Sequence, residues 1–173
     1  MSLSMYDASV PAFLQGLKGL KTVLTKAEAH AEARKIDPNA LLQARLYPDM
    51  FTLVRQVQIA TDFAKGAAGR LAGAELPVFE DTETSFEDLQ ARVTKAAAFI
   101  EGLSAADFEG SETRQVSLNR RGEVVSFTGK DYLLLQALPN FWFHTTTAYA
   151  ILRHNGVDVG KTDYLGSLDL KSP

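Results

Sequence analysis

The stretch LPNFWFHTTTAYAILRHNG, residues 138–156, carries the pattern that decides the fold. With the residues just before it, this stretch places side chains at three- and four-residue intervals along one helical face: Leu134, Leu138, Phe141, Thr145, Ala148 and Leu152. That spacing predicts one long helix from about residue 129 to residue 154. Asn155 and Gly156 end it, because glycine readily takes the left-handed conformation after a helix.

Pro139 lies inside this predicted helix. Proline has no backbone N–H, and its ring clashes with the preceding helical turn. We therefore expect a kink here and a carbonyl at Leu135 that lacks its helical partner.

Three earlier segments repeat the same apolar period. The first runs over residues 6–34 with Val10, Phe13, Leu17, Leu20 and Leu24 on its stripe. The second has a lead-in over residues 40–47, restarts at Pro48 and Asp49, and carries Leu53, Val57, Ala60, Ala64, Ala67 and Leu71. The third begins at a Thr84 or Ser85 cap and carries Phe86, Leu89, Val93, Ala96 and Ile100. Four amphipathic helices predict an all-α fold, a four-helix bundle.

The segment between the second and third helices is long and lacks a helical period. Residues 72–85 form an acidic stretch with a proline, longer than the two to eight residues usual between neighbouring bundle helices. Fully extended, it reaches roughly 46 Å at about 3.3 Å per residue. It can therefore cross the length of the bundle and leave the second and third helices parallel.

Two short β-favouring runs, residues 113–118 and 123–127, flank the turn sequence Asn-Arg-Arg-Gly at 119–122. This arrangement predicts a small β-hairpin between the third and fourth helices. Residues 157–173 are expected to form a tail that packs through Tyr164 and Leu165 and has a mobile end.

Composition narrows the classes of function. The 173 residues suit a single domain, residues 1–173, and the net charge of -3 gives no electrostatic reason to bind nucleic acid or an anionic membrane. The chain has no cysteine, which excludes disulfides, thiolate nucleophiles and sulfur-ligated metals. Without a signal peptide or a spanning segment at sequence level, we expect a cytoplasmic protein.

Two segments and the tail carry a family resemblance. They are LYPDMF (46–51) running into QVQIATDFAK (56–65), the stretch 138–156 quoted above, and GKTDYLG (160–166). Together they resemble a domain-of-unknown-function branch, of DUF1993 type, in the DinB/YfiT-like superfamily of metalloenzymes. The resemblance covers nearly the whole chain. It implies a four-helix bundle in up-down-down-up order, in agreement with the crossover.

The resemblance also implies where a metal would bind. Metal-binding members of the superfamily use one His on helix two and a His-x-x-x-His pair on helix four, since residues four apart share a helix face. Here His144 matches the first position of the pair, but Ala148 occupies the second. Helix two has no His. Gln56, Gln58 and Asp62 stand where its ligand would lie, and the implied ion is a divalent metal such as zinc or nickel.

The helical wheel leaves the partner of His144 open. His144 and Gln56 lie at comparable edges of their apolar stripes, whereas Gln58 and Asp62 share the opposite face of helix two. Geometry favours Gln56 and ligand chemistry favours Asp62. Asp62 could instead orient the imidazole as a carboxylate orients a catalytic base. His30 and His154 are expected to be structural, His154 through the dipole at a helix end.

Phe141, Trp142 and Phe143 cannot all face the core from one helix, so at least one must face solvent, a ligand or a second chain. We expect a homodimer. Three functions remain open: a bundle with an altered site around His144 that binds a small molecule or a divalent metal; a metal-dependent transferase-type enzyme; and a non-catalytic, dimeric partner-binding protein.

Overall fold

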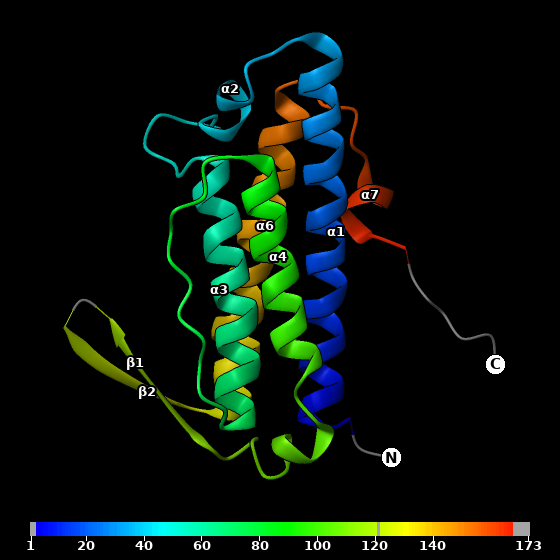
Figure 1. The fold of residues 1–173 in the computed structure, drawn as a ribbon. Coiled ribbons are helices and arrows are strands. Elements are labelled where there is room, and N and C mark those ends of the chain that lie inside the picture. The colour runs from blue at the N-terminus through cyan, green and yellow to red at the C-terminus, as the bar shows by residue number, and fades with distance from the viewer. Residues whose placement is uncertain (1–2, 121, 168–173) are drawn as a thin grey trace.

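The structure of the protein, a computed structural model, describes residues 3–120 and 122–167. Four long helices form the bundle: α1 (Met5–Arg34), α3 (Leu53–Ala72), α4 (Phe86–Glu101) and α6 (Leu138–His154). In Figure 1, α1 and α6 run upward while α3 and α4 run downward. The predicted up-down-down-up bundle is confirmed. The mobile end expected for the tail includes residues 168–173, which lie outside the described residues.

Shorter elements connect these helices. They are α2 (Pro38–Leu42), the 3₁₀ turn η1 (Ala105–Phe108), strands β1 (Gln115–Arg120) and β2 (Glu123–Thr128), α5 (Gly129–Asp131), the π-helical segment η2 (Tyr132–Ala137) and α7 (Lys161–Leu165). In the described part of the chain, no helix is both long enough and apolar enough to cross a membrane.

The predicted apolar stripes meet in one core. α3 packs against both α4 and α6, and α1 packs against the same two helices. The stripe of α3 consists largely of small residues, among them Ala60, Ala64 and Ala67, all fully buried. Small side chains allow helix axes to approach closely. Large side chains fill the remaining space, with Phe13 of α1 edge-on to Phe141 of α6 at 5.1 Å between ring centroids.

The second bundle helix begins later than the sequence indicates. The prediction that it restarts at Pro48 and Asp49 is wrong, because α3 begins at Leu53. Thr52 has the extended backbone of a cap, and its hydroxyl accepts a hydrogen bond from the Arg55 amide. Residues 43–52 instead form a loop, which the Leu53 N–H closes by donating to the Ala44 carbonyl.

The crossover and the hairpin match the predictions. Residues 73–85 run along the bundle beside α3, and α4 then starts at the same end as α3 (Figure 1). Ser85 and Asp88 form a capping box at the start of α4. β1 and β2 pair antiparallel, from Gln115 opposite Thr128 to Arg120 opposite Glu123. β1 lies two residues further toward the C-terminus than the predicted run, and β2 starts where predicted and ends one residue later.

Pro139 interrupts the last helix as predicted, but the interruption is more than a kink. The six residues before Leu138 adopt a π-helix, and a new α-helix starts at Leu138 with Pro139 in its first turn. A first turn suits proline, because amides there have no intrahelical acceptor. π-Helical turns are rare and frequently occur at functional sites.

The C-terminal segment packs on α1 and α6, as expected. The Tyr164 hydroxyl hydrogen-bonds Thr146 at 2.9 Å, and its ring lies 5.7 Å from that of Tyr149. Gln15 donates to the Leu165 carbonyl. Gly19 of α1 allows this contact, since a Cβ there would lie 1.9 Å from the Tyr164 carbonyl oxygen.

We therefore predict that Gly19→Ala destabilises the protein by about 2 kcal/mol, the typical cost of overpacking, and displaces α7. Alanine's better helix propensity, worth up to ~1 kcal/mol, does not offset a clash with backbone. Thermal unfolding by circular dichroism measures stability, and the fluorescence of the only tryptophan, Trp142, reports α7 because its ring lies 6.3 Å from that of Tyr164. Gly102→Ala is the control, since its Cβ would make only ordinary contacts. Equal stability of the two variants would contradict this packing.

Candidate functional site

The side chain of His144 lies between α6 and α3. It is 8% exposed, and its Nδ1 lies 2.7 Å from Oε1 of Gln56 on α3. Gln56 itself is buried at 1% exposure. Among the residues proposed from the helical wheel, Gln56 is the one that the fold brings to His144.

The hydrogen bonds of Gln56 determine the tautomer of His144. The Gln56 amide nitrogen donates to the Phe51 carbonyl at 3.3 Å, so its amide oxygen faces the imidazole. An amide oxygen only accepts, and therefore Nδ1 of His144 carries the proton. In the neutral ring, Nε2 then holds an unshared lone pair. Nε2 has no hydrogen-bond partner among the described residues. Nε2 also retains contact with solvent: among the described residues, the one side-chain atom that is both fully buried and without a hydrogen bond is Ser111 Oγ, not Nε2.

Two aromatic rings hold the imidazole in place. Phe63 of α3 stacks on it with ring centroids 6.0 Å apart and an interplanar angle of 15°. Phe143 contacts it edge-on at 5.1 Å. One hydrogen bond and two aromatic contacts thus fix the imidazole ring, and Nε2 takes part in none of the described hydrogen bonds.

Burial, together with the nearby positive charge of Arg55, lowers the pKa of His144 from its ordinary 6.5 to about 4. Both causes disfavour the imidazolium. His144 is therefore neutral at physiological pH. It can accept a hydrogen bond at Nε2, but it is a weak base.

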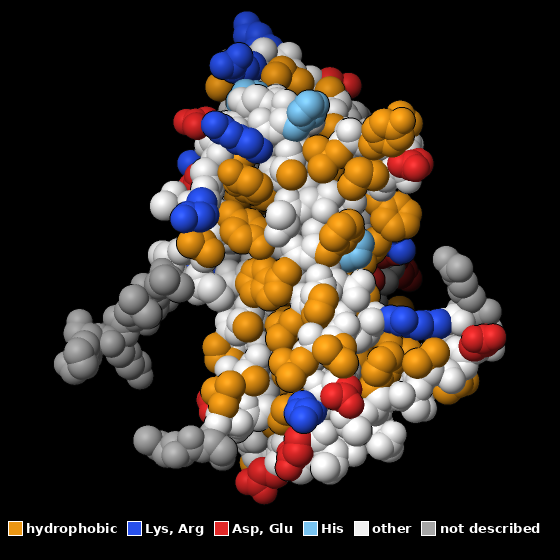
Figure 2. Space-filling view, turned by 180° about the vertical axis from the view of Figure 1, so that it is seen from behind, with side chains coloured by type: hydrophobic (Ala, Val, Ile, Leu, Met, Phe, Trp, Pro, Cys, Tyr) orange, Lys and Arg blue, Asp and Glu red, His pale blue; other side chains and the backbone are white. Residues whose placement is uncertain are grey.

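An apolar groove of about 520 Å³ adjoins this site through Phe143, while His144 itself is not among its lining residues. Its walls come from α6 and from the loop that follows α2: Leu46, Met50, Trp142, Phe143, Thr146, Thr147 and Ala150. Phe143 belongs to this groove and also contacts His144. Figure 2 shows hydrophobic side chains gathered along the face of the molecule on which α6 lies.

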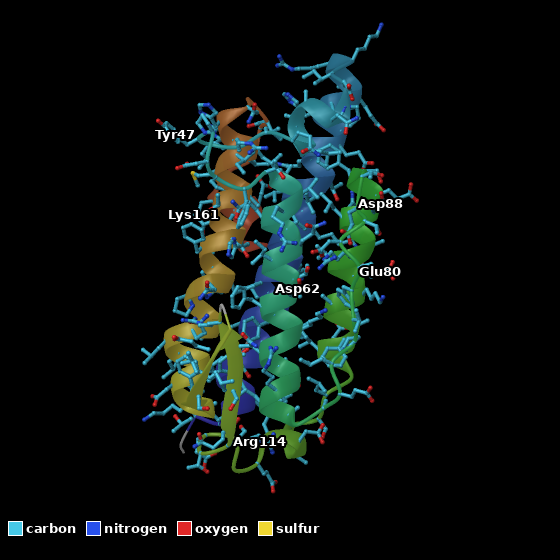
Figure 3. The ribbon with its side chains drawn as sticks, turned by 90° about the vertical axis from the view of Figure 1, so that its left-hand side faces the viewer. Tyr47, Asp62, Glu80, Asp88, Arg114 and Lys161 are labelled. Atoms are coloured by element: carbon cyan, nitrogen blue, oxygen red, sulfur yellow. The ribbon has the colours of Figure 1, made fainter. Side chains whose placement is uncertain are left out.

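Gln58 and Asp62 take part in a separate polar cluster around Arg92 of α4, which is 4% exposed. Gln58 donates to Glu83 at 2.8 Å. Asp62 pairs with Lys65 and with Arg92, each at 3.1 Å. Figure 3 shows Asp62 near the middle of α3, between the hairpin on one side and the crossover segment that carries Glu80 on the other. These two side chains are engaged away from His144.

The Arg92 cluster fastens the crossover to the bundle. Arg92 binds Glu83 at 2.8 Å and Asp81 at 3.1 Å, both in the crossover, and its Nε donates to Thr61 of α3 at 2.8 Å. Sequence reasoning missed this residue. The available signal was an arginine in the apolar stripe of α4, between Leu89 and Ala96.

The donors around His144 do not fit a divalent metal. His144 supplies one imidazole, Gln56 is neutral and already bonded at both ends of its amide, and Ala148 has no donor. Within the described residues, no three His, Cys, Asp or Glu side chains are placed to share an ion. His30 is half-buried on α1, and His154 is exposed at the end of α6. The superfamily's ligand set is thus incomplete at this site.

The lowered pKa predicts a pH dependence of stability. Between pH 6.5 and about 4 the unfolded chain binds a proton at His144 that the folded protein does not, so folding stability falls as the pH falls. The loss from this group is about 1.4 kcal/mol per pH unit in that range. His144→Gln retains a donor for Gln56 but has no titrating group. Urea unfolding at a series of pH values should show the extra slope in the wild type only, and parallel curves would refute a neutral, buried imidazole.

Comparison with known proteins agrees with the geometry. The family described as "Domain of unknown function (DUF1993)" matches residues 5–165. The crystal structure of a DinB family member from Shewanella denitrificans is similar over 98% of this chain and 96% of that one, with 45% sequence identity and a TM-score of 0.89. No curated protein matches the sequence. The protein therefore belongs to the DUF1993 family and has the DinB-like fold.

Proposed function

We propose that the protein binds a small apolar molecule that carries one hydrogen-bond donor, with His144 as the acceptor. The observation that carries this proposal is the unshared lone pair at Nε2 of His144. Gln56 fixes that lone pair in one position, because it holds the proton on Nδ1. A fixed acceptor beside apolar surface is typical of small-molecule sites, in which a few polar groups orient the ligand.

The groove next to His144 provides the apolar contacts. Its volume of about 520 Å³ lies within the usual range of ligand pockets. Its walls offer an aromatic ring, Phe143, together with aliphatic side chains and the hydroxyls of Thr146 and Thr147. A planar aromatic ligand with an N–H or O–H at its edge suits this combination.

Binding is better supported than acid–base or metal chemistry. A general base works best with a pKa near the working pH, and the pKa of about 4 at His144 is far below it. The transferase-type alternative needs a metal held by several ligands, and the donors around His144 supply one imidazole and one engaged amide. A hydrogen-bond acceptor that only holds a ligand requires neither a pKa near the working pH nor a bound metal.

Indole and N-methylindole test the proposal as a matched pair of probes, since only indole has an N–H. We predict that indole binds the wild type and that His144→Phe weakens its binding about fivefold, the equivalent of one hydrogen bond of ~1 kcal/mol. N-Methylindole should bind both proteins equally. Chemical shifts of the Thr146 and Thr147 amides in NMR titrations measure both affinities.

Two outcomes contradict the proposal. One is that His144→Phe weakens the binding of indole and of N-methylindole equally, which would mean that the variant alters only the shape of the groove. The other is stoichiometric uptake of zinc or nickel by protein purified without added metal, abolished in His144→Phe. In that case Nε2 would be a metal ligand and the transferase-type alternative would gain support.

A homodimer is the second candidate, and exposed apolar side chains favour it. Phe143 is 57% exposed, with Tyr47 at 65% and Phe51 at 55% on the loop after α2. Phe143 also lines a groove with Leu46 and Met50 of the same loop, and exposed apolar side chains on neighbouring elements are typical of a protein–protein interface. We infer that a second copy of the chain covers these side chains.

Phe51→Glu should therefore convert a dimer into a monomer, because it places a charge among these exposed side chains without touching the core. Analytical ultracentrifugation over a range of concentrations measures the mass. Val78→Glu is the control, since Val78 is 85% exposed on the crossover segment, away from α6. A wild type that stays monomeric at every concentration would rule out the dimer.

A further inference from the structure

A second cavity lies between α3 and the hairpin. Its volume is about 390 Å³. Side chains from α3, β1 and η2 line it: Asp62, Phe63, Arg70, Ser117, Leu118, Asn119, Arg120, Tyr132 and Gln136. Figure 1 shows the hairpin leaning out from one end of the bundle, on the side of α3.

Arg70 is built into one wall of the cavity. Its Nη1 donates to the Tyr132 hydroxyl at 3.2 Å, and Tyr132 is 1% exposed. Gly66 makes room for the guanidinium, because a Cβ at this position would lie 2.5 Å from Nη1. Within the described residues, no carboxylate pairs with Arg70. Its charge is positioned by a neutral hydroxyl and remains uncompensated.

Arg120 brings a second guanidinium to the same cavity. It lies over the ring of Phe127, 5.9 Å from the centroid, and Phe127 lies 6.3 Å from the ring of Tyr132. A chain of contacts through Phe127 and Tyr132 thus connects the two arginines, and of these two rings Tyr132 lines the cavity. Glu123 faces Arg120 across the hairpin register, but the described side chains form no ion pair there.

The carboxylate that does line the cavity is already neutralised. Asp62 pairs with Arg92 and with Lys65, each at 3.1 Å. The two guanidinium groups of the cavity thus have no acidic partner of their own in the part of the chain that the structure describes.

β1 contributes further polar groups through its outer edge. Four consecutive residues of β1 line the cavity and none of β2 does, and β1 pairs only with β2 in the described chain. An unpaired strand edge presents free backbone N–H groups. Together with the guanidinium groups, these donors suit an oxyanion.

We propose that this cavity binds a small organic anion, with a carboxylate or phosphate group at Arg70 and Arg120 and a planar body against Phe63. The shared chemistry is an oxyanion that accepts several charge-assisted hydrogen bonds, which arginine forms better than lysine because of its planar fork. The cavity shares no lining residue with the groove that Phe143 lines, although Phe63 also stacks on His144. Each can be tested without the other.

Benzoate and phenyl phosphate are the probes, and benzamide is the neutral control of the same shape. Titrations by NMR, observing the side-chain Nε–H signals of Arg70 and Arg120, should show binding of at least one anion and none of benzamide at the same concentration. The stronger of the two anions identifies the group that the site prefers. Binding should weaken with added salt, since the attraction is between charges.

Variants locate the site. Arg70→Gln and Arg120→Gln should each weaken anion binding about tenfold, because charge-assisted hydrogen bonds are lost. Tyr132→Phe should weaken it by a smaller factor, since it removes only the hydroxyl that positions Arg70. Arg34→Gln, which removes a positive charge at the end of α1, is the matched control and should leave anion binding unchanged.

The proposal fails if neither anion binds the wild type at millimolar concentration. It also fails if Arg34→Gln weakens binding as much as Arg70→Gln, because the anions would then respond only to net charge. Circular dichroism confirms that each variant is folded before its affinity is compared.

Discussion

The close approach of α3 and α6 is the constraint on which the rest of the structure depends. Fully buried alanines on α3, such as Ala60 and Ala64, allow the helices to pack with little between them. Only at such a separation can two short polar side chains meet across the interface, and Gln56 and His144 do so at 2.7 Å. The burial that stabilises the bundle also lowers the pKa of His144. Burial between α3 and α6 thus contributes both to the stability of the core and to the neutral state of His144.

On the other side of α3, a buried charge organises the chain. Arg92 is 4% exposed and could not remain there without partners, because an unpaired buried charge costs several kcal/mol. The crossover supplies carboxylates at Asp81 and Glu83, and α3 supplies Asp62. A long segment without secondary structure is thereby held in one place. The ring of Phe79, over which the ammonium group of Lys65 lies at 3.8 Å, adds a cation–π contact to the same cluster.

The fold was accessible from sequence because helix periodicity and the length of the crossover are local signals. The site was accessible only in part. Helical wheels put His144 and Gln56 at the edges of their stripes, which made Gln56 one of the candidate partners of His144. A wheel shows neither the tautomer nor the stacking of Phe63. Gln58 and Asp62 could not be placed, since their partners lie in the crossover and on α4, far away in sequence. The start of α3 was misjudged because Pro48 and Thr52 are both acceptable helix starters, and tertiary packing chose the second.

The π-helical segment before Pro139 also affects how far the hairpin is rotated about the helix axis relative to α6. A π-turn corresponds to one residue more than an α-helical turn contains. Each residue of an α-helix turns the chain by about 100°, so the extra residue rotates everything that precedes it, including the hairpin, relative to α6. Tyr132 is the first residue of this segment, and its hydroxyl accepts a hydrogen bond from Arg70 of α3. A relative of this protein that lacked one residue between positions 132 and 137 would keep its bundle while its hairpin faced another direction.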